Sequence, residues 1–200
     1  MYVLYLHRIM NPLLGVAAVT SLLVYAFTQK GPGNLVECTS TLDGRAYRVQ
    51  DLPDKQDAAN RLSEIRTGLD KILHEYRQPE YFHDEPTQLL VQRLKIDNLM
   101  ENDVASQYTS YSENKGERIV LCLRDKTTAP YPLVDVNTVM FVTLHEMAHL
   151  MTVSSGHTQE FWTNFRRLLQ DAMKAGVYTQ VNYSRSPVEY CGMMITDSPL

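Results

Sequence analysis

Within residues 51–78, apolar residues recur every three or four positions from Leu62 to Tyr76, and this spacing predicts an amphipathic helix with one buried stripe. Asp54 is placed to cap the N-terminus of this helix. A shorter apolar pattern after Pro86 predicts a second helix that runs into a loop. The stripe of the first helix, which we expect in the core, consists of Leu62, Ile65, Leu69, Ile72, Leu73 and Tyr76.

Alternating apolar and polar residues predict two β-hairpins. The first covers residues 35–50, with Asp43-Gly44 as its turn, because this dipeptide supplies the positive φ angles of a tight hairpin turn. The second covers residues 106–125, where alternate residues of its last strand share one face. Cys122 lies on the other face of that strand, and we expect it to be an ordinary buried thiol.

The segment from residue 137 to residue 155 contains no Gly or Pro, and it predicts one continuous helix that begins at Asp135 or Asn137. Gly156 ends this connection. A further amphipathic helix is predicted over residues 158–176, whose apolar stripe consists of Phe161, Phe165, Leu168, Leu169 and Met173. Together these elements predict a chain that contains both helices and strands.

The N-terminal end departs from this pattern. From Ile9 to Thr28 the chain carries no charge, and about 20 helical residues at about 1.5 Å each span roughly 30 Å, the thickness of the hydrocarbon core of a bilayer. This run predicts a single transmembrane helix, with a cleaved signal peptide as the alternative. We therefore expect an N-terminal transmembrane anchor at residues 1–30, a folded domain at residues 31–200, and a single-pass membrane localisation.

Composition narrows the classes of function. Of the 200 residues 44% are hydrophobic and 21% are charged, which is typical of a folded domain and excludes a disordered chain. The net charge of −4 and the lack of a basic cluster argue against a nucleic-acid partner. Three cysteines, at positions 38, 122 and 191, are too few and too dispersed for a disulfide framework, and without a Cys-x-x-Cys pair they predict no cysteine metal site.

Candidate chemistry gathers in "TLHEMAHL", residues 143–150, and in the "MTVSSGH" that follows. Residues four apart lie one turn apart on a helix, so His145 and His149 can point their imidazoles at one ion, about 2.0–2.1 Å from each nitrogen. Glu146 lies beside that face, where it can act on a water as general base without ligating the metal. His157 fits the third ligand, which leaves one position of a zinc ion open for catalysis.

Other interpretations of the same residues remain. The histidines could be hydrogen-bonded residues of an amphipathic helix, without a metal. The metal site could be a closed structural one, with Glu160 or Glu146 as fourth ligand, and Glu160 could also replace His157 as third ligand. The tail offers three tyrosines that could stabilise an oxyanion or simply pack, namely Tyr178, Tyr183 and Tyr190.

The segment "LHEMAHLMTVSSGHTQEFW" resembles the WLM and SprT-like zincin metallopeptidases, in which His-Glu-x-x-His is followed by Gly-His and an aromatic helix. The chain is more similar still to WLM-like, membrane-anchored proteins of large DNA viruses that infect algae and protists. This likeness extends over residues 35–197, through "SYSENKGERIVLCLR" to "YCGMMIT". It implies a compact α+β, zincin-like fold with a small antiparallel sheet over the motif helix. It also implies Zn²⁺ on His145, His149 and His157, and Glu146 as general base.

The leading hypothesis is therefore a membrane-anchored zinc metallopeptidase that hydrolyses peptide bonds of a protein substrate. The alternative is a structural virion or minor capsid protein, in which the zincin-like domain is a scaffold that contacts capsid proteins at the viral membrane. Cellular members of the family act on protein–DNA crosslinks. The acidic balance of this chain and its lack of a basic tail argue against that substrate.

Overall fold

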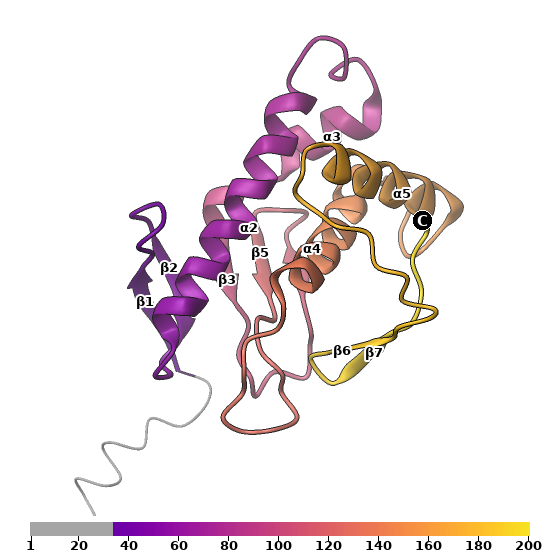
Figure 1. The fold of residues 1–200 in the computed structure, drawn as a ribbon. Coiled ribbons are helices and arrows are strands. Elements are labelled where there is room, and N and C mark those ends of the chain that lie inside the picture. Colours follow the sequence, from indigo (N-terminus) through magenta and orange to yellow (C-terminus); the bar gives the residue numbers. More distant parts are fainter. Residues whose placement is uncertain (1–33) are drawn as a thin grey trace, which may run out of the picture. The chain divides into compact units, whose positions relative to one another are not determined.

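Residues 34–200 are described by a computed structural model, which contains helices, a sheet and a small separate hairpin (Figure 1). In chain order the elements are β1 (Leu35–Thr39), β2 (Ala46–Gln50), α2 (Lys55–Tyr76), α3 (Glu85–Arg93), η1 (Ile96–Asn98), β3 (Leu99–Glu101), β4 (Tyr111–Glu113), β5 (Arg118–Leu121), α4 (Val136–Met151), α5 (Gln159–Lys174), β6 (Val188–Tyr190) and β7 (Met193–Ile195). The fold is thus of the mixed α/β kind that the sequence indicates.

The sheet has five strands in the order β1-β2-β3-β5-β4. Its two outer pairs, β1 with β2 and β4 with β5, are antiparallel, whereas β3 runs parallel to both β2 and β5. The expectation of a small antiparallel sheet was therefore wrong. After β2 the chain crosses through α2 and α3 before it re-enters the sheet, and such a long crossover allows the next strand to be parallel.

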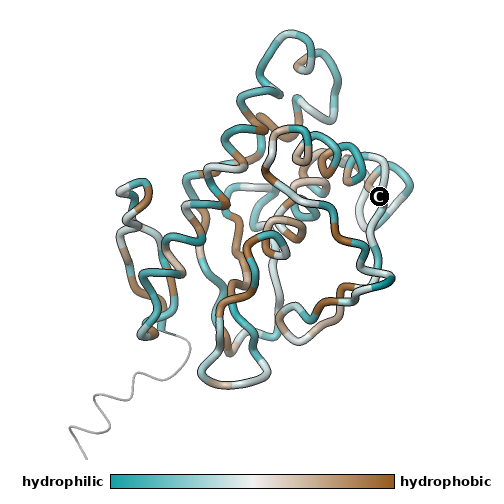
Figure 2. The backbone as a smooth tube through the Cα atoms, viewed as in Figure 1, coloured by the Kyte–Doolittle hydropathy of each residue, from teal (hydrophilic) through white to brown (hydrophobic). Residues whose placement is uncertain are grey.

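The predicted helix stripe is confirmed in α2. Its six apolar residues are all at most 1% exposed, and α2 packs on β1, β2 and β3 as well as on α4. Figure 2 shows hydrophilic residues along the connection between α2 and α3. Asp54 precedes α2, as predicted, but its side chain makes no capping hydrogen bond and binds Arg124 instead.

Both predicted hairpins are present. In the first, strands β1 and β2 pair from Leu35 with Gln50 to Thr39 with Ala46, and Gly44 has a positive φ of 70°. The connection is wider than a two-residue turn, because Ser40 N–H donates to the Arg45 carbonyl at 2.8 Å and closes a larger loop. In the second, strands β4 and β5 pair from Tyr111 with Val120 to Glu113 with Arg118.

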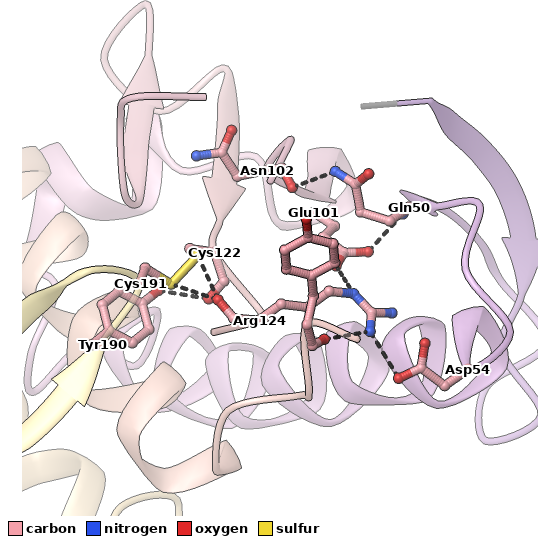
Figure 3. Close-up of polar contacts among 9 residues, drawn as sticks. Gln50, Asp54, Glu101, Asn102, Cys122, Arg124, Tyr190 and Cys191 are labelled. Carbon is pink, nitrogen blue, oxygen red and sulfur yellow. Dashed lines mark hydrogen bonds and ion pairs between the residues drawn. A yellow bond between two sulfur atoms is a disulfide. The ribbon is translucent and has the colours of Figure 1, made fainter. Parts of the chain in front are cut away.

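A buried arginine joins the sheet to the start of α2 (Figure 3). Arg124 and Glu101 are each 1% exposed, and Arg124 Nε lies 2.7 Å from Glu101 Oε1. Arg124 Nη1 lies 2.8 Å from Asp54 Oδ2 and donates to the Tyr131 carbonyl. The other carboxylate oxygen of Glu101 accepts a hydrogen bond from the backbone N–H of Gln50 at 2.7 Å. The pair is therefore buried and hydrogen-bonded, although Arg124 Nη2 has no hydrogen-bond partner among the described residues.

The C-terminal tail forms a hairpin, β6–β7, that the sequence did not predict. Cys191, in the turn of this hairpin, forms a disulfide with Cys122 beyond β5, with their Cα atoms 6.4 Å apart (Figure 3). The expectation that Cys122 is an ordinary thiol was therefore wrong. Two cysteines that are 69 residues apart carry no sequence signal that they meet in the fold. Cys38 is free.

The localisation also needs a correction. Within residues 34–200 no helix is both long and apolar enough to cross a membrane. The 22-residue helix α2 is interrupted by charged residues, and the apolar α4 has 16 residues, about 24 Å, which is shorter than a bilayer core. The predicted anchor at residues 9–28 lies outside the described residues. This finding contradicts the predicted single-pass localisation. The predicted domain boundary between residues 30 and 31 stays a prediction.

Candidate metal centre

Helix α4 presents the first two histidines. Asp135 caps the helix by accepting a hydrogen bond from Thr138 N–H at 3.0 Å, and no Gly or Pro interrupts the turns that follow. His145 and His149 are four residues apart and half-buried, so they lie on the same face of α4. The opposite face of α4 is buried in the core, which fixes the direction of the two rings.

A loop returns the chain from α4 to α5 and carries His157. Gly156, at a φ of +80°, allows the reversal just before this histidine. Asn164 of α5 is 5% exposed, and its Nδ2 donates to the Thr152 hydroxyl at 3.0 Å, which ties α5 to the end of α4. The loop is therefore held at both ends by α5.

Glu160 holds the middle of this loop. Its carboxylate accepts hydrogen bonds from Val153 N–H at 3.0 Å and from the Ser154 hydroxyl at 2.7 Å. These bonds lower the pKa of Glu160, with the Val153 amide as the largest cause. Because both oxygens are engaged by the loop, Glu160 supports the segment that carries His157 and does not join the histidine cluster.

The three histidines converge. One ring nitrogen from each of His145, His149 and His157 lies within 4.8 Å of the others, and the Nε2 atoms of His145 and His157 are 3.1 Å apart. Two nitrogens at about 2.0–2.1 Å from one tetrahedral ion would be about 3.3–3.4 Å apart. The His145–His157 separation is within a few tenths of an ångström of this value, and all three nitrogens are close enough to approach a single divalent cation.

Phe161 forms the floor of the cluster. Its buried ring lies 4.9 Å from the ring of His145, 4.4 Å from that of His149 and 4.7 Å from that of His157, measured between centroids. Phe165 adds a contact to His145 at 5.3 Å. This apolar floor limits the directions that the rings can take, and it leaves their nitrogens to face one another.

The charges at the site follow from this environment. Burial lowers the pKa of His145 to about 3, with further lowering by His149 and His157, and burial followed by His157 lowers the pKa of His149. Both rings are therefore neutral at pH 7, the form that binds a metal. Burial raises the pKa of Glu146 to about 7, and a hydrogen bond with the backbone of Ser112 opposes this rise.

A cavity of about 280 Å³ opens beside the cluster and includes His145, Glu146 and His157 in its lining. A larger hollow of about 540 Å³ lies against α2 and the start of α4, around Gly68 and Met140, and none of the three histidines lines it. The cavity beside the histidines is therefore the one that can bring a ligand to them.

The three candidate oxyanion tyrosines serve packing. The Tyr190 hydroxyl donates to the Cys122 carbonyl at 2.8 Å and lies 2.6 Å from Ser110 Oγ, so its hydrogen bonds are used (Figure 3). Tyr178 and Tyr183 are buried against Phe141, with ring centroids 5.9 Å and 4.7 Å away. An oxyanion donor is therefore not identified among these three.

Sequence reasoning missed several residues that shape the site. Phe161 is the core residue that its helix stripe predicts, but the stripe did not show that its ring also contacts the three histidines. Asn164 and Ser112 carried no local signal, because each acts on a residue from another element. The β6–β7 hairpin was missed for the same reason.

Comparison with known proteins agrees with this picture. The family model described as "WLM domain" matches residues 89–187, a range that contains all three histidines. An uncharacterized protein of Acanthamoeba polyphaga mimivirus is 32% identical over 182 residues, which are 89% of this chain and 91% of that protein. An uncharacterized protein of Invertebrate iridescent virus 6 is 41% identical over 71 residues, 36% of this chain and 39% of that protein.

Among solved structures, Wss1 from Saccharomyces cerevisiae is 21% identical, with a TM-score of 0.47, and covers 64% of this chain and 86% of its own. The family match and the nearly full-length similarity to the mimivirus protein confirm the predicted resemblance to viral WLM-like proteins. The chain belongs to the WLM domain family.

Proposed function

We propose that this protein is a zinc metallopeptidase that hydrolyses peptide bonds of a protein substrate. The observation that carries the proposal is the convergence of three histidine nitrogens within 4.8 Å at the edge of a cavity that Glu146 also lines. Three protein ligands leave a tetrahedral ion one open position, which distinguishes catalytic zinc sites from closed structural ones. Family membership supports the same chemistry.

In this proposal His145, His149 and His157 would hold the zinc ion, which would act as a Lewis acid and make water nucleophilic near neutral pH. Glu146 directly follows His145 on α4 and reaches the cavity instead of the cluster. Its carboxylate is placed to take a proton from the attacking water and to return it to the leaving amine. The bond with the Ser112 backbone holds this carboxylate at the edge of the sheet.

The test is the Glu146→Gln variant. Glutamine has nearly the same shape but cannot accept the proton, so hydrolysis of an unfolded protein such as casein should fall by about 10²–10⁴-fold. Zinc content, measured by atomic absorption on the same samples, should remain near one ion per chain. Glu37→Gln, an exposed change on β1, is the matched control and should leave both quantities unchanged.

Hydrolysis by the Glu146→Gln protein at the rate of the unmodified protein would show that the assignment of the base is wrong. A zinc-loaded protein without any hydrolytic activity, before or after the substitution, would favour the alternative of a structural scaffold. The described residues contain no observation that favours the scaffold over catalysis, and we do not propose it.

A further inference from the structure

The cavity beside the histidines has the size and the lining to hold one large apolar group. Its volume of about 280 Å³ is close to the lower limit of small-molecule pockets, about 300 Å³, so it has room for one side chain and its surroundings. Most of its lining is apolar and comes from α4, α5 and the β6–β7 hairpin: Phe141, Val142, Trp162, Phe165, Tyr190, Met193, Met194 and Ile195.

The charges in this lining are of one sign. Glu146 and Asp197 both line the cavity, and no Lys or Arg from residues 34–200 does so. Apart from the proposed zinc ion, whose open position is taken by water and the reacting peptide group, an acidic side chain would meet only carboxylates and apolar walls, which makes its burial in the cavity unfavourable. The lining selects against acidic groups and gains most from apolar ones.

We propose that this cavity is a specificity pocket, in which a bulky apolar side chain of the peptide substrate, such as that of Leu or Phe, is bound next to the bond that is cleaved. The inference rests on the proposed function, because it is the presence of His145 and Glu146 in the lining that places the bound side chain beside the reaction. Small and acidic side chains at the same position are disfavoured.

The outer wall of the pocket is fixed to the body of the domain. The β6–β7 hairpin contributes Tyr190, Met193 and Ile195 to the lining, and its turn is attached to the end of β5 through Cys191. The hydrogen bonds of Tyr190 to Cys122 and Ser110 form a second attachment (Figure 3). A wall held in this way keeps the size of the pocket constant, which size selection requires.

Trp162 provides a direct measure of occupancy. It is the single tryptophan of the chain, it lines the cavity and it is 39% exposed, so a group that enters the pocket changes its surroundings. Its fluorescence can be followed in the zinc-loaded Glu146→Gln protein, in which a peptide binds without being cleaved. Binding is then measured independently of activity.

The experiment titrates this protein with blocked pentapeptides that are identical except for a central Leu, Phe, Ala, Lys or Asp in a background of alanines. We expect the Leu and Phe peptides to shift the Trp162 emission and to bind about tenfold more tightly than the Ala peptide, with Asp the weakest. Equal affinities for Leu and Ala, or tighter binding of Lys or Asp, would overturn the proposal.

A second protein tests the pocket itself. Val142→Phe, added to Glu146→Gln, places a ring in the cavity and should reduce the preference for Leu over Ala to less than about twofold. Leu42→Phe, at an exposed position of the first hairpin, is the matched control and should keep the preference. An unchanged preference in the Val142→Phe protein overturns the assignment, and the peptide series alone decides the proposal if that protein does not fold.

The two proposals fail in different ways. If the unmodified protein cleaves no peptide, the proposed function fails, although the fluorescence titration still shows whether the pocket selects apolar groups. If it cleaves the Leu and Ala peptides with equal kcat/KM, the peptidase assignment stands and the specificity pocket is rejected.

Discussion

Outside the histidine cluster, Arg124 links parts of the fold that are distant in the sequence. It is 1% exposed and lies between Glu101 of β3 and Asp54 at the start of α2, so it joins elements that are far apart in the sequence. Breaking a buried ion pair by removing one partner typically costs about 3–5 kcal/mol, because the remaining charge stays buried. Neither carboxylate has another cation among its described partners.

This predicts the effect of Arg124→Met. We expect the free energy of unfolding, measured with urea, to fall by about 3 kcal/mol at about pH 8 and by less at about pH 5. Burial already raises the pKa of Glu101, with Arg124 opposing the rise, and removal of Arg124 raises this pKa further. A raised pKa in the folded state means that stability falls as pH rises through it, so protonated Glu101 relieves the loss in acid.

Two further proteins check this explanation. Adding Glu101→Gln to Arg124→Met should recover part of the lost stability and remove its dependence on pH, because no buried charge remains. Arg45→Met, which breaks an exposed pair with Asp97, should cost less than about 1 kcal/mol. A loss in Arg124→Met that is the same at both pH values would contradict a role for Glu101.

At the scale of elements, short-range patterns in the sequence predicted the helices but not the contacts between distant segments. The stripe of α2 and the unbroken run of α4 specify their helices directly, and the spacing of His145 and His149 places both rings on one face. The three-residue strand β3 is too short for a periodic signal, and its parallel pairing depends on where α2 and α3 return the chain. The Cys122–Cys191 bond depends on the complete fold.

The disulfide that attaches the β6–β7 hairpin can be tested by removing one of its two cysteines. Closing a loop with a sequence separation of 69 residues is worth up to about 4 kcal/mol in the chain-entropy model, and measured values are commonly about 2–4 kcal/mol. We expect Cys191→Ser to lower the free energy of unfolding by that amount and to weaken binding of the Leu peptide at Trp162, because one wall of the pocket loses its attachment.

Cys38→Ser is the matched control, since Cys38 is free and half-buried on β1. It should change stability by less than about 1 kcal/mol. Treatment of the Glu146→Gln protein, which binds the peptide without cleaving it, with a phosphine reductant that leaves zinc in place should reproduce the Cys191→Ser result. A reductant that changes neither stability nor peptide binding would show that the bond contributes little to the hairpin.

At the scale of the whole molecule, the site exists only when separate parts of the fold meet. His145 and His149 come from α4, His157 comes from the loop before α5, and the cavity wall comes from a hairpin near the end of the described chain. The sequence could name the histidines from their spacing, but it could not show the cavity, because its lining is drawn from three elements. Metal binding should therefore depend on folding.

This dependence predicts a measurable stabilisation. A ligand that binds only the folded state adds about 2.7 kcal/mol when its concentration is 100 times its Kd, which for a domain of this size raises Tm by about 5–10 °C. We expect Zn²⁺ to produce such a rise in the unmodified protein, and a chelator to reverse it. His149→Ala removes one of three ligands and should reduce the rise to less than about 2 °C. His74→Ala, at an exposed histidine of α2, should keep the full effect. Because each protein is compared with itself with and without zinc, any change in intrinsic stability cancels. An equal rise in the His149→Ala protein would place the zinc elsewhere, and the three histidines would then be no more than a cluster of packed rings.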